Sequence, residues 1–393
     1  MAKLLLSCDD YIFRHDGRYY FKNKEWYNFY QRYLRVFEEI RIANRVIPED
    51  SLKEGRILVE DSSIEIYPVP IFHGPSEYIT KYFSVGRALK GAVEGCDAAV
   101  LRLPSTVAQR LSKSVIQSMI PYACEIVFNA KDGQESSSSM TERVLWWMID
   151  KKMKKICENA DGVSCVTQFQ LQKRYYSIKP NHFESHYSSL ELHKEFFSGP
   201  RHYPEKSVMT IAHVSNQIKL LGRKGEAALI EAIGRLRSQG IIVNLKFAGD
   251  DWDNSSKDIY DFASKQGVGE QVSCVGYLSR EQLESFLQDA DIFVLPTKAE
   301  GLPRVIIEAM AKGLPTITTP VSGNPELISR RFLVDYDDVM SLAERIKELV
   351  LDKYLYEEAS LENYTNSLNY EATVLEKRRD AFYTQLKERI VKK

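Results

Sequence analysis

Two glutamates, Glu300 and Glu308, stand eight residues apart where an apolar run, a turn-rich loop and a helical pattern follow one another. The apolar run 292–295 is typical of a buried parallel strand, and the spacing over 304–312 predicts a helix that ends before a glycine. Glu300 would lie at the mouth of this helix and Glu308 about two turns further along, so the two would contact different parts of a long ligand. A helix N-terminus suits phosphate. Glu300 could equally be only a helix cap.

Three cations, Lys219, Arg223 and Lys224, lie in a loop between a predicted strand at 208–214 and a predicted helix at 225–238. Side-chain cations beside a helix N-terminus suit a diphosphate. A solvated basic turn is the alternative for each of them. The position of Lys224 directly before a glycine favours the phosphate interpretation.

Two further strand ends carry glycines. Gly249 follows an apolar run and would allow a ligand to approach the backbone closely. Gly276 and Tyr277 end another run, where backbone groups could hydrogen-bond a base edge. The ring of Tyr277 is expected to pack rather than to stack on a base.

Strand and helix patterns alternate along most of the chain, which predicts an α/β fold of doubly wound parallel sheets. The alternation breaks at 190–205, where Gly199, Pro200 and Pro204 indicate a linker. We therefore expect two domains, 1–200 and 205–369.

Composition excludes several classes of protein. The 393 residues carry a net charge of −1, which gives no global field for nucleic acid. The first apolar run is too short for a signal peptide, and no run is long enough to span a membrane. Six scattered cysteines show no metal-ligand spacing. We expect a reduced cytoplasmic protein without a bound metal.

The second half of the chain resembles the donor-binding domain of the retaining glycosyltransferases of family 4, which have the GT-B fold. The resemblance covers roughly residues 208–330 and includes the family's E-x7-E pair, here Glu300 and Glu308. The other matching pieces are Arg223-Lys224-Gly225, Phe247-Ala248-Gly249, Val275-Gly276-Tyr277, the segment 296–303, Glu308-Ala309-Met310, Gly313-Leu314-Pro315 and Pro325-Glu326-Leu327-Ile328.

This resemblance implies two Rossmann-like domains that face a cleft, with the last helix, 370–393, crossing back to the first domain. Glu308 would hold the ribose hydroxyls of a nucleotide-sugar, and Glu300 would contact the sugar ring near the reacting carbon. The diphosphate would be held by Lys224 and by the N–H groups of Gly301, Leu302 and Arg304. The family's arginine falls at Lys219, so either Lys219 or Arg223 would supply the second cation.

The resemblance further implies retaining, metal-independent sugar transfer. We expect no cofactor beyond the donor and favour a UDP-sugar over a GDP-sugar, although the residues themselves fix neither the base nor the sugar. Arg102, in the segment 102–105, resembles a loop of capsular and exopolysaccharide relatives. It would act in catalysis or be buried for structural reasons. The loops 8–18, 72–76 and 102–106 would line the acceptor side, and the serine-rich segment 131–140 would form a loop able to close over the acceptor. His15 and His73 are the candidates for the family's donor-contacting histidine.

The helix predicted at 142–155 carries Trp146, Trp147 and four lysines, Lys151, Lys152, Lys154 and Lys155. It could rest on an anionic membrane, or simply pack through its tryptophans. The sequence thus predicts a glycosyltransferase acting on a glycan or lipid-linked acceptor in cell-envelope polysaccharide or glycolipid synthesis, in the cytoplasm or at the inner face of the membrane. The alternatives are another GT-B activity, such as a phosphorylase or epimerase, and a catalytically silent GT-B subunit that binds sugar or nucleotide and supports a partner enzyme.

Overall fold

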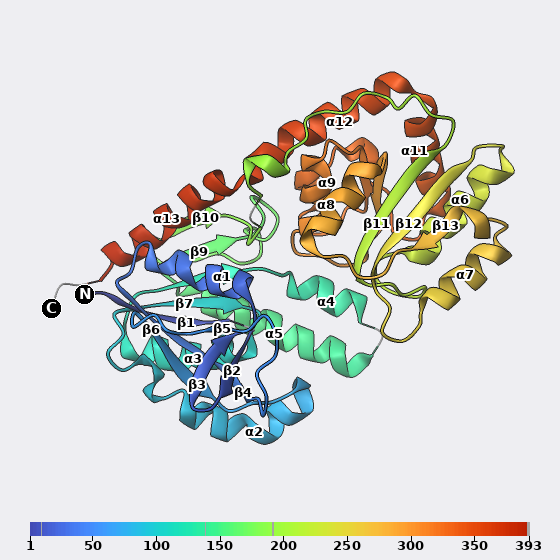
Figure 1. The fold of residues 1–393 in the computed structure, drawn as a ribbon. Coiled ribbons are helices and arrows are strands. Elements are labelled where there is room, and N and C mark those ends of the chain that lie inside the picture. Colours follow the sequence, from blue (N-terminus) through green and yellow to red (C-terminus); the bar gives the residue numbers. More distant parts are fainter. Residues whose placement is uncertain (9, 138, 191, 391–393) are drawn as a thin grey trace. The chain divides into compact units, whose positions relative to one another are not determined.

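The computed structural model describes residues 1–8, 10–137, 139–190 and 192–390. It divides into two compact units (Figure 1). The N-terminal unit comprises Met1–Lys131, Thr141–Tyr187 and Glu376–Lys393, and the C-terminal unit comprises Asp132–Met140 and Ser188–Leu375. The predicted α/β fold of doubly wound, mainly parallel sheets is confirmed in both units.

The sheet of the N-terminal unit has a parallel centre in the order β6-β4-β1-β7-β8-β9-β10. Chain order reverses between β1 and β7, so the loops that follow these two strands leave the sheet in opposite directions. The strands are β1 (Lys3–Ser7), β4 (Glu39–Pro48), β6 (Ile64–Val69), β7 (Ala98–Leu103), β8 (Tyr122–Ile126), β9 (Gly162–Cys165) and β10 (Phe183–His186).

A β-hairpin occupies most of the segment that we predicted as the polar loop 8–18. Strands β2 (Tyr11–His15) and β3 (Arg18–Phe21) pair antiparallel, and β3 also pairs with β5 (Ile57–Leu58). Asp16 and Gly17, with φ of 47° and 77°, form the two-residue turn, and an Asp-Gly pair with positive φ is a strong hairpin signal. The loop prediction is therefore wrong for 11–18. Asp9 lies outside the described residues.

In the described part of the N-terminal unit, five α-helices cover this sheet. The apolar faces of α2, α3 and α5 share one core cluster with β7 and β8. On α1 and α13, the rings of Tyr33 and Tyr383 stack with centroids 4.8 Å apart. The helices are α1 (Lys24–Leu34), α2 (Gly74–Ala88), α3 (Thr106–Ser118), α5 (Met140–Glu158) and α13 (Ala372–Glu388), with a 3-10 turn at Gly91–Val93.

The segment 131–140 is not an open loop throughout. Helix α4 (Ala130–Ser136) covers its first half, and Ser137 Oγ donates to the carbonyl of Gly133. The prediction of a loop is therefore wrong for 131–136. Ser138 lies outside the described residues.

The C-terminal unit has a five-stranded parallel sheet in the order β13-β12-β11-β14-β15. The strands are β11 (Met209–Gln217), β12 (Val243–Asp250), β13 (Val272–Cys274), β14 (Ile292–Leu295) and β15 (Thr316–Thr318). The helices are α6 (Glu226–Ser238), α7 (Ser256–Lys265), α8 (Arg280–Asp289), α9 (Arg304–Ala311), α10 (Asn324–Leu327), α11 (Val339–Leu351) and α12 (Lys353–Ser367), with 3-10 turns at Lys194–Phe196, Gly269–Gln271, Arg330–Phe332 and Leu368–Tyr370.

The segment 188–205, which contains the predicted linker, belongs to the C-terminal unit by its contacts. Arg201 anchors it there, because the guanidinium donates to the carbonyls of Lys312 and Ala290 at 2.7 Å each. The backbone N–H of Arg201 donates to the hydroxyl of Ser360 at 2.6 Å. The contact boundary therefore lies between Tyr187 and Ser188.

Candidate functional site

The switch point of the C-terminal sheet lies between β11 and β14, which are parallel neighbours. β11 continues into the loop 218–225 and helix α6, and β14 continues into the loop 296–303 and helix α9. In open α/β sheets such diverging loops leave a crevice at the carboxyl edge, where ligands bind. The sheet thus brings the two segments with the candidate donor-binding residues to the same place.

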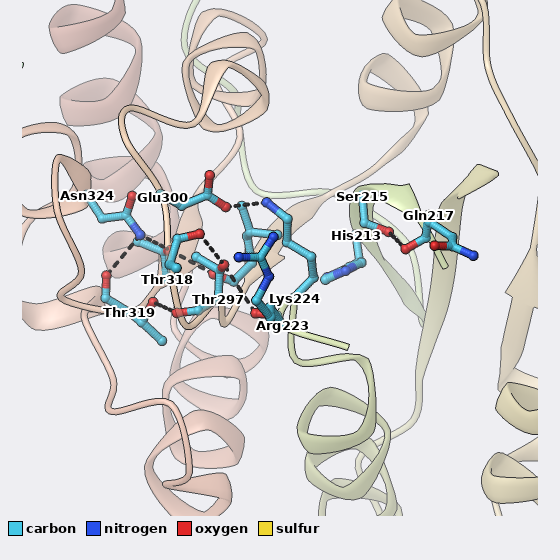
Figure 2. Close-up of polar contacts among 12 residues, drawn as sticks. His213, Ser215, Gln217, Arg223, Lys224, Thr297, Glu300, Thr318, Thr319 and Asn324 are labelled. Atoms are coloured by element: carbon cyan, nitrogen blue, oxygen red, sulfur yellow. Dashed lines mark hydrogen bonds and ion pairs between the residues drawn. The ribbon is translucent and has the colours of Figure 1, made fainter. Parts of the chain in front are cut away.

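Lys224 and Glu300 form an ion pair at this switch point (Figure 2). The side chain of Lys224 is 29% exposed and that of Glu300 is 12% exposed. The two residues are 76 positions apart in sequence. The structure therefore unites two predicted catalytic residues and leaves both within reach of solvent. Their catalytic roles remain predictions.

The loop that carries Lys224 is clamped from the opposite side of the switch point. The carbonyl of Arg223 accepts from the backbone N–H of Lys298 at 2.8 Å and from the hydroxyl of Thr297 at 3.3 Å. The hydroxyl of Tyr336 donates to the carbonyl of Gly222 at 3.3 Å. These contacts fix the loop backbone, so its cations are presented from a rigid base.

Gly225 has a conformation and surroundings that exclude a side chain. Its φ is 84°, and a Cβ atom there would lie 2.2 Å from the carbonyl oxygen of Pro296. This close approach brings the β11 and β14 loops into backbone contact and starts α6 at Glu226. The glycine after Lys224 is therefore a steric requirement of the junction.

A buried network of hydroxyls and an amide supports the Glu300 loop from below (Figure 2). Asn324 donates to the hydroxyl of Thr318 at 2.9 Å and to the carbonyl of Thr319 at 3.0 Å. Thr319 Oγ1 donates to the carbonyl of Thr297 at 2.5 Å, and all four side chains are fully buried. Sequence reasoning missed this network, although the run Thr316–Thr319 contains three threonines within a buried strand and its end.

Other predicted phosphate ligands surround this junction. Pro303 is the N-cap of α9, so the helix begins with N–H groups that no preceding turn can satisfy. Arg304, Lys219 and Arg223 are exposed. Across the described residues, none of these three side chains forms a hydrogen bond or an ion pair. They are thus available to an anion, whereas Lys224 is already paired with a carboxylate.

Three further predicted ligands lie on the loop 296–303 or on helix α9. Gly301 and Leu302 are buried, and the carbonyl of Gly301 accepts from the N–H of Gly323 at 3.0 Å. Glu308 is half-buried on the second turn of α9. The loop is thereby tied to the segment after β15. Glu300 lies on this loop, and Glu308 lies about one turn into α9.

Gly249 and Gly276, the two glycines predicted at strand ends, differ in their surroundings. A Cβ atom at Gly249 would lie 2.5 Å from the carbonyl of Ser215, so the close approach is to the neighbouring strand. Gly276 has a φ of 77° and open space around it, and its carbonyl accepts from the N–H of Gly249 at 2.9 Å. Tyr277 is 70% exposed, not packed. The expected packing of Tyr277 is therefore wrong, and its contact with a base remains a prediction.

Arg102, the third predicted catalytic residue, lies in the N-terminal unit on β7 and donates to Glu125 of β8 at 3.0 Å. The carboxylate of Glu125, only 4% exposed, also accepts from the hydroxyls of Tyr33 at 3.1 Å, Tyr187 at 2.9 Å and Tyr383 at 2.5 Å. Burial raises the pKa of Glu125, but Arg102 and the phenols outweigh burial and hold this pKa below its ordinary value. This contact explains the position of Arg102 in the fold, and its role in catalysis remains a prediction.

Cys8, the first residue of the predicted acceptor-side loop 8–18, contacts side chains of neighbouring elements. Cys8 Sγ lies 3.1 Å from the hydroxyl of Tyr30 and accepts from the amide of Asn44 at 3.4 Å. Burial is the main cause that raises the pKa of the Cys8 thiol to about 12. This thiol therefore remains protonated and is a packing residue.

The candidate histidines occupy ordinary positions in the same unit. His15 ends β2, and its Nδ1 lies 2.9 Å from the carbonyl of Glu49. His73 is the exposed N-cap of α2, where its backbone N–H donates to Glu77 at 2.9 Å. Helix α2 begins at Gly74, so the predicted loop 72–76 is shorter than expected. Donor contact by either histidine remains a prediction.

The lysines of α5 divide into two groups. Lys152 is half-buried, and burial lowers its pKa to about 8. Lys154 pairs with Asp150 at 3.3 Å. Lys151 and Lys155 are exposed. Of the four lysines named from the sequence, Lys151 and Lys155 are therefore the two that are exposed to solvent.

Comparison with known proteins identifies the C-terminal unit. The profile of the family described as glycosyl transferases group 1 matches residues 217–366. These residues form a glycosyltransferase group 1 domain. The match includes the loop of Lys224, the loop of Glu300 and helix α9.

Two curated relatives illustrate how far the similarity extends. Protein CapJ of Staphylococcus aureus is 26% identical over 384 residues, which cover 94% of this chain and 91% of CapJ. The putative colanic acid biosynthesis glycosyltransferase WcaL of Escherichia coli is 29% identical over 153 residues, which cover 36% of this chain and 37% of WcaL. The predicted resemblance to capsular and exopolysaccharide glycosyltransferases is confirmed.

Solved structures establish the fold. Sucrose-phosphate synthase from Thermosynechococcus elongatus aligns with a TM-score of 0.73 at 16% identity, covering 99% of this chain and 100% of the synthase. HepE from Anabaena, in complex with UDP and glucose, aligns with a TM-score of 0.64 at 12% identity, covering 96% of this chain and 98% of HepE. The protein, whose residues 217–366 match the group 1 glycosyltransferase profile, therefore has the predicted GT-B fold.

The described residues lack two features that would change the interpretation of the site. Among the residues with assigned positions, His, Cys, Asp and Glu side chains form no cluster of three or more that could hold a metal ion. Within those same ranges, each helix is too short or too polar to cross a membrane.

Proposed function

We propose that this glycosyltransferase moves a sugar from a nucleotide diphosphate-sugar to an acceptor with retention at the anomeric carbon and without a metal. The observation that carries the proposal is the Lys224–Glu300 ion pair at the switch point of the C-terminal sheet. Negative charge builds on the departing diphosphate as the sugar leaves. Fixed cations and helix N–H groups at that place stabilise this charge in the transition state.

Each residue has a defined role in this proposal. Lys224 holds the diphosphate together with the N–H groups of Gly301, Leu302 and Arg304. Glu300, held beside Lys224, contacts the sugar ring near the reacting carbon, and the ion pair exchanges for contacts with the donor. Glu308 holds the ribose hydroxyls, which its place about one turn into α9 supports.

The remaining donor contacts come from the exposed cations and the glycine strand ends. Either Lys219 or Arg223 supplies the second cation for the diphosphate, because both are exposed beside Lys224. Backbone groups at Gly249, Gly276 and Tyr277 contact the base. A UDP-sugar is favoured as donor, and the complex of HepE with UDP and glucose supports this choice.

The acceptor is a glycan or a lipid-linked saccharide of cell-envelope polysaccharide or glycolipid synthesis. The named activity of WcaL, colanic acid biosynthesis, supports this class of product. The protein would act in the cytoplasm or at the inner face of the membrane. Arg102 acts in this proposal through the position of Glu125 and the helices bonded to it.

The exposed apolar and basic face of helix α5 is suited to peripheral contact with an anionic membrane. Val144, Trp147 and Met148 share one face and are 50%, 45% and 57% exposed, while other residues of the helix lie in the core of the N-terminal unit. Lys151 and Lys155 continue the exposed face, and the ammonium of Lys151 lies 3.9 Å from the Trp147 ring centroid. Exposed apolar side chains beside cations suit a bilayer interface with anionic lipids.

A donor panel tests the proposed activity. The protein is mixed with UDP-, GDP- and ADP-sugars, and nucleotide binding and slow donor hydrolysis are measured, followed by transfer to extracted lipid-linked acceptors. We expect one nucleotide class to bind and its sugar to be transferred with retention, as read by NMR of the product anomer. Inversion of the product anomer would contradict the proposal.

The same panel separates the alternatives. Binding without turnover, even with acceptors present, would indicate a silent subunit, and release of an epimerised sugar-nucleotide would indicate an epimerase. Glu308→Ala should weaken nucleotide affinity by about tenfold through the lost ribose contacts. The matched control is Glu344→Ala, which removes a half-exposed carboxylate from α11. Unchanged affinity in Glu308→Ala would refute the ribose assignment.

A further inference from the structure

A buried acid and a buried imidazole lie beneath the loop of Lys224. His213 on β11 and Glu226, the first residue of α6, are both fully buried. Nε2 of His213 lies 3.7 Å from Oε1 of Glu226, beyond hydrogen-bond reach. Over the described part of the chain, neither this nitrogen nor either carboxylate oxygen has a hydrogen-bond partner. Buried polar atoms in this state are uncommon and call for a physical explanation.

The neighbours of His213 determine which of its nitrogens faces the acid. Nδ1 lies 2.9 Å from the carbonyl of Val294. Because a carbonyl can only accept, Nδ1 carries a hydrogen. The ring also packs edge-on against Phe247, with centroids 5.2 Å apart. Nε2 is therefore the nitrogen that faces the Glu226 carboxylate.

The charge of the pair follows from this arrangement. If one proton is shared between Nε2 and the Glu226 carboxylate, the pair is neutral wherever that proton sits. If the proton is lost, one uncompensated negative charge remains in the protein interior. Such a charge interacts strongly with its surroundings because water does not screen it.

The carboxylate lies directly under the candidate phosphate loop. A Cβ atom built on Gly222 would be 3.5 Å from Oε2 of Glu226. The hydroxyl of Tyr336 donates to the carbonyl of Gly222. The pKa of Tyr336 is raised mainly by burial, and further by the negative charges of Asp337 and Glu226. A net charge on the pair therefore acts on whatever anion the loop binds.

We propose that His213 neutralises Glu226 beneath the phosphate loop and thereby sets the affinity of the site for a nucleoside diphosphate. His213 is thus a positioning residue that prevents a buried carboxylate from repelling the donor. The inference rests on the proposed function, since it takes the loop to bind the diphosphate. Tyr336 interacts electrostatically with both Asp337 and Glu226. The variants below leave Tyr336, Asp337 and the loop cations Lys219, Arg223 and Lys224 unchanged.

Single and double substitutions test the charge argument, because loss of the imidazole and loss of the carboxylate should have different effects on UDP affinity. His213→Asn keeps a donor near the Nδ1 position for Val294 and removes Nε2, which leaves the acid uncompensated. Glu226→Gln has the same shape as the native side chain and no charge. The control is Glu231→Gln, which neutralises another acid on α6.

The probe is UDP, measured by calorimetry, with uncharged uridine measured by ligand-observed NMR. We expect His213→Asn to weaken UDP binding on the order of tenfold and to leave uridine binding unchanged. Glu226→Gln should bind UDP at least as tightly as the wild type. The double variant should return to within about twofold of the wild type, since both charges are gone.

A second comparison keeps the test decisive if His213→Asn does not fold. Glu226→Gln and the double variant both lack the buried charge, so both should bind UDP about as tightly as the wild type or more tightly. A clear loss of UDP affinity in Glu226→Gln would contradict the inference.

Two results would overturn the inference, and they are distinguishable. Equal losses of UDP affinity in both single variants, without recovery in the double variant, would show a purely structural pair and leave the proposed function intact. Absence of binding by the wild type to UDP, GDP and ADP alike would overturn the proposed function, and this inference with it.

Discussion

Replacement of Arg102 by methionine distinguishes the two roles that its sequence context allows. Methionine keeps much of the aliphatic length of arginine but leaves the carboxylate of Glu125 without its cation. That carboxylate is 4% exposed, and Arg102 itself is 18% exposed. Removal of one partner from a buried pair costs about 3–5 kcal/mol. The three tyrosine hydroxyls that remain on Glu125 offset part of this cost, so we expect a loss of about 3 kcal/mol at pH 7.

Urea denaturation followed by tryptophan fluorescence measures this loss. Trp26, Trp146 and Trp147 all belong to the N-terminal unit, so the signal reports mainly on the unit that contains Arg102. With a slope of about 2–3 kcal/mol per molar urea, the midpoint should fall by about 1 M or more. Arg143→Met, which removes an exposed cation from α5, should leave the midpoint unchanged.

The dependence on pH supplies a second check. The pKa of Glu125 is lowered in the folded protein, although burial by itself raises it. A depressed folded pKa contributes stability that is present above the unfolded value and is lost as pH falls through the folded value. Without Arg102 the effect of burial dominates, so the acid-induced loss of stability should begin at higher pH. The double variant Arg102→Met/Glu125→Leu should recover much of the loss.

The result that would refute this reasoning is specific. If Arg102→Met unfolds at the same urea concentration as the wild type but no longer transfers sugar, Arg102 acts on the reactants and its bond to Glu125 is secondary. A lower midpoint with transfer intact under native conditions supports the structural role. If Arg102→Met shows both a lower urea midpoint and no sugar transfer, the double variant Arg102→Met/Glu125→Leu decides between the roles. Under the structural role, sugar transfer by the double variant should return together with its stability.

Three other predictions follow from the same contacts. Lys224→Met should weaken UDP binding by at least tenfold, through the lost charge-assisted contact, and leave uridine binding unchanged; equal loss for both ligands in titrations would contradict this. Gly225→Ala should lower the free energy of unfolding by about 2 kcal/mol or more, because its Cβ would meet the carbonyl of Pro296 and φ is positive; an unchanged melting temperature would show that the junction can open. Trp147→Ser should reduce flotation with phosphatidylglycerol vesicles several-fold, whereas the exposed Trp252→Ser in the C-terminal unit should not; equal flotation of both variants would remove α5 from the membrane contact.

The sequence alone determined the family and the layout of the C-terminal unit. Spacing places Glu300 at the mouth of a helix and Glu308 further along it, and the structure gives that helix as Arg304–Ala311. The glycine after Lys224 also followed from local pattern. These features depend on residues within about ten positions of one another, the range over which periodicity and turn chemistry act.

Two loop predictions are wrong, and in one of them the local sequence itself carries the contrary signal. Asp16-Gly17 is a hairpin signal that lies in the sequence itself, yet the polar residues around it favoured a loop. The serines of 131–140 also favour a loop, whereas the structure has helix α4 over 130–136. In both segments a polar composition does not mean absence of structure, because the backbone hydrogen bonds of short elements do not require apolar side chains.

Only the tertiary structure decided which distant side chains meet. Glu125 accepts from Tyr383, 258 positions away, and Tyr336 bonds to Gly222, 114 positions away. The sequence shows His213 and Glu226 as one histidine in a strand and one acid at a helix start, with no sign that they face each other. The physical reason is that sheet order and helix packing, set by burial of apolar surface along the whole chain, bring such groups together. The local sequence pattern determines which segments form helices and strands, and tertiary packing determines which charged side chains pair.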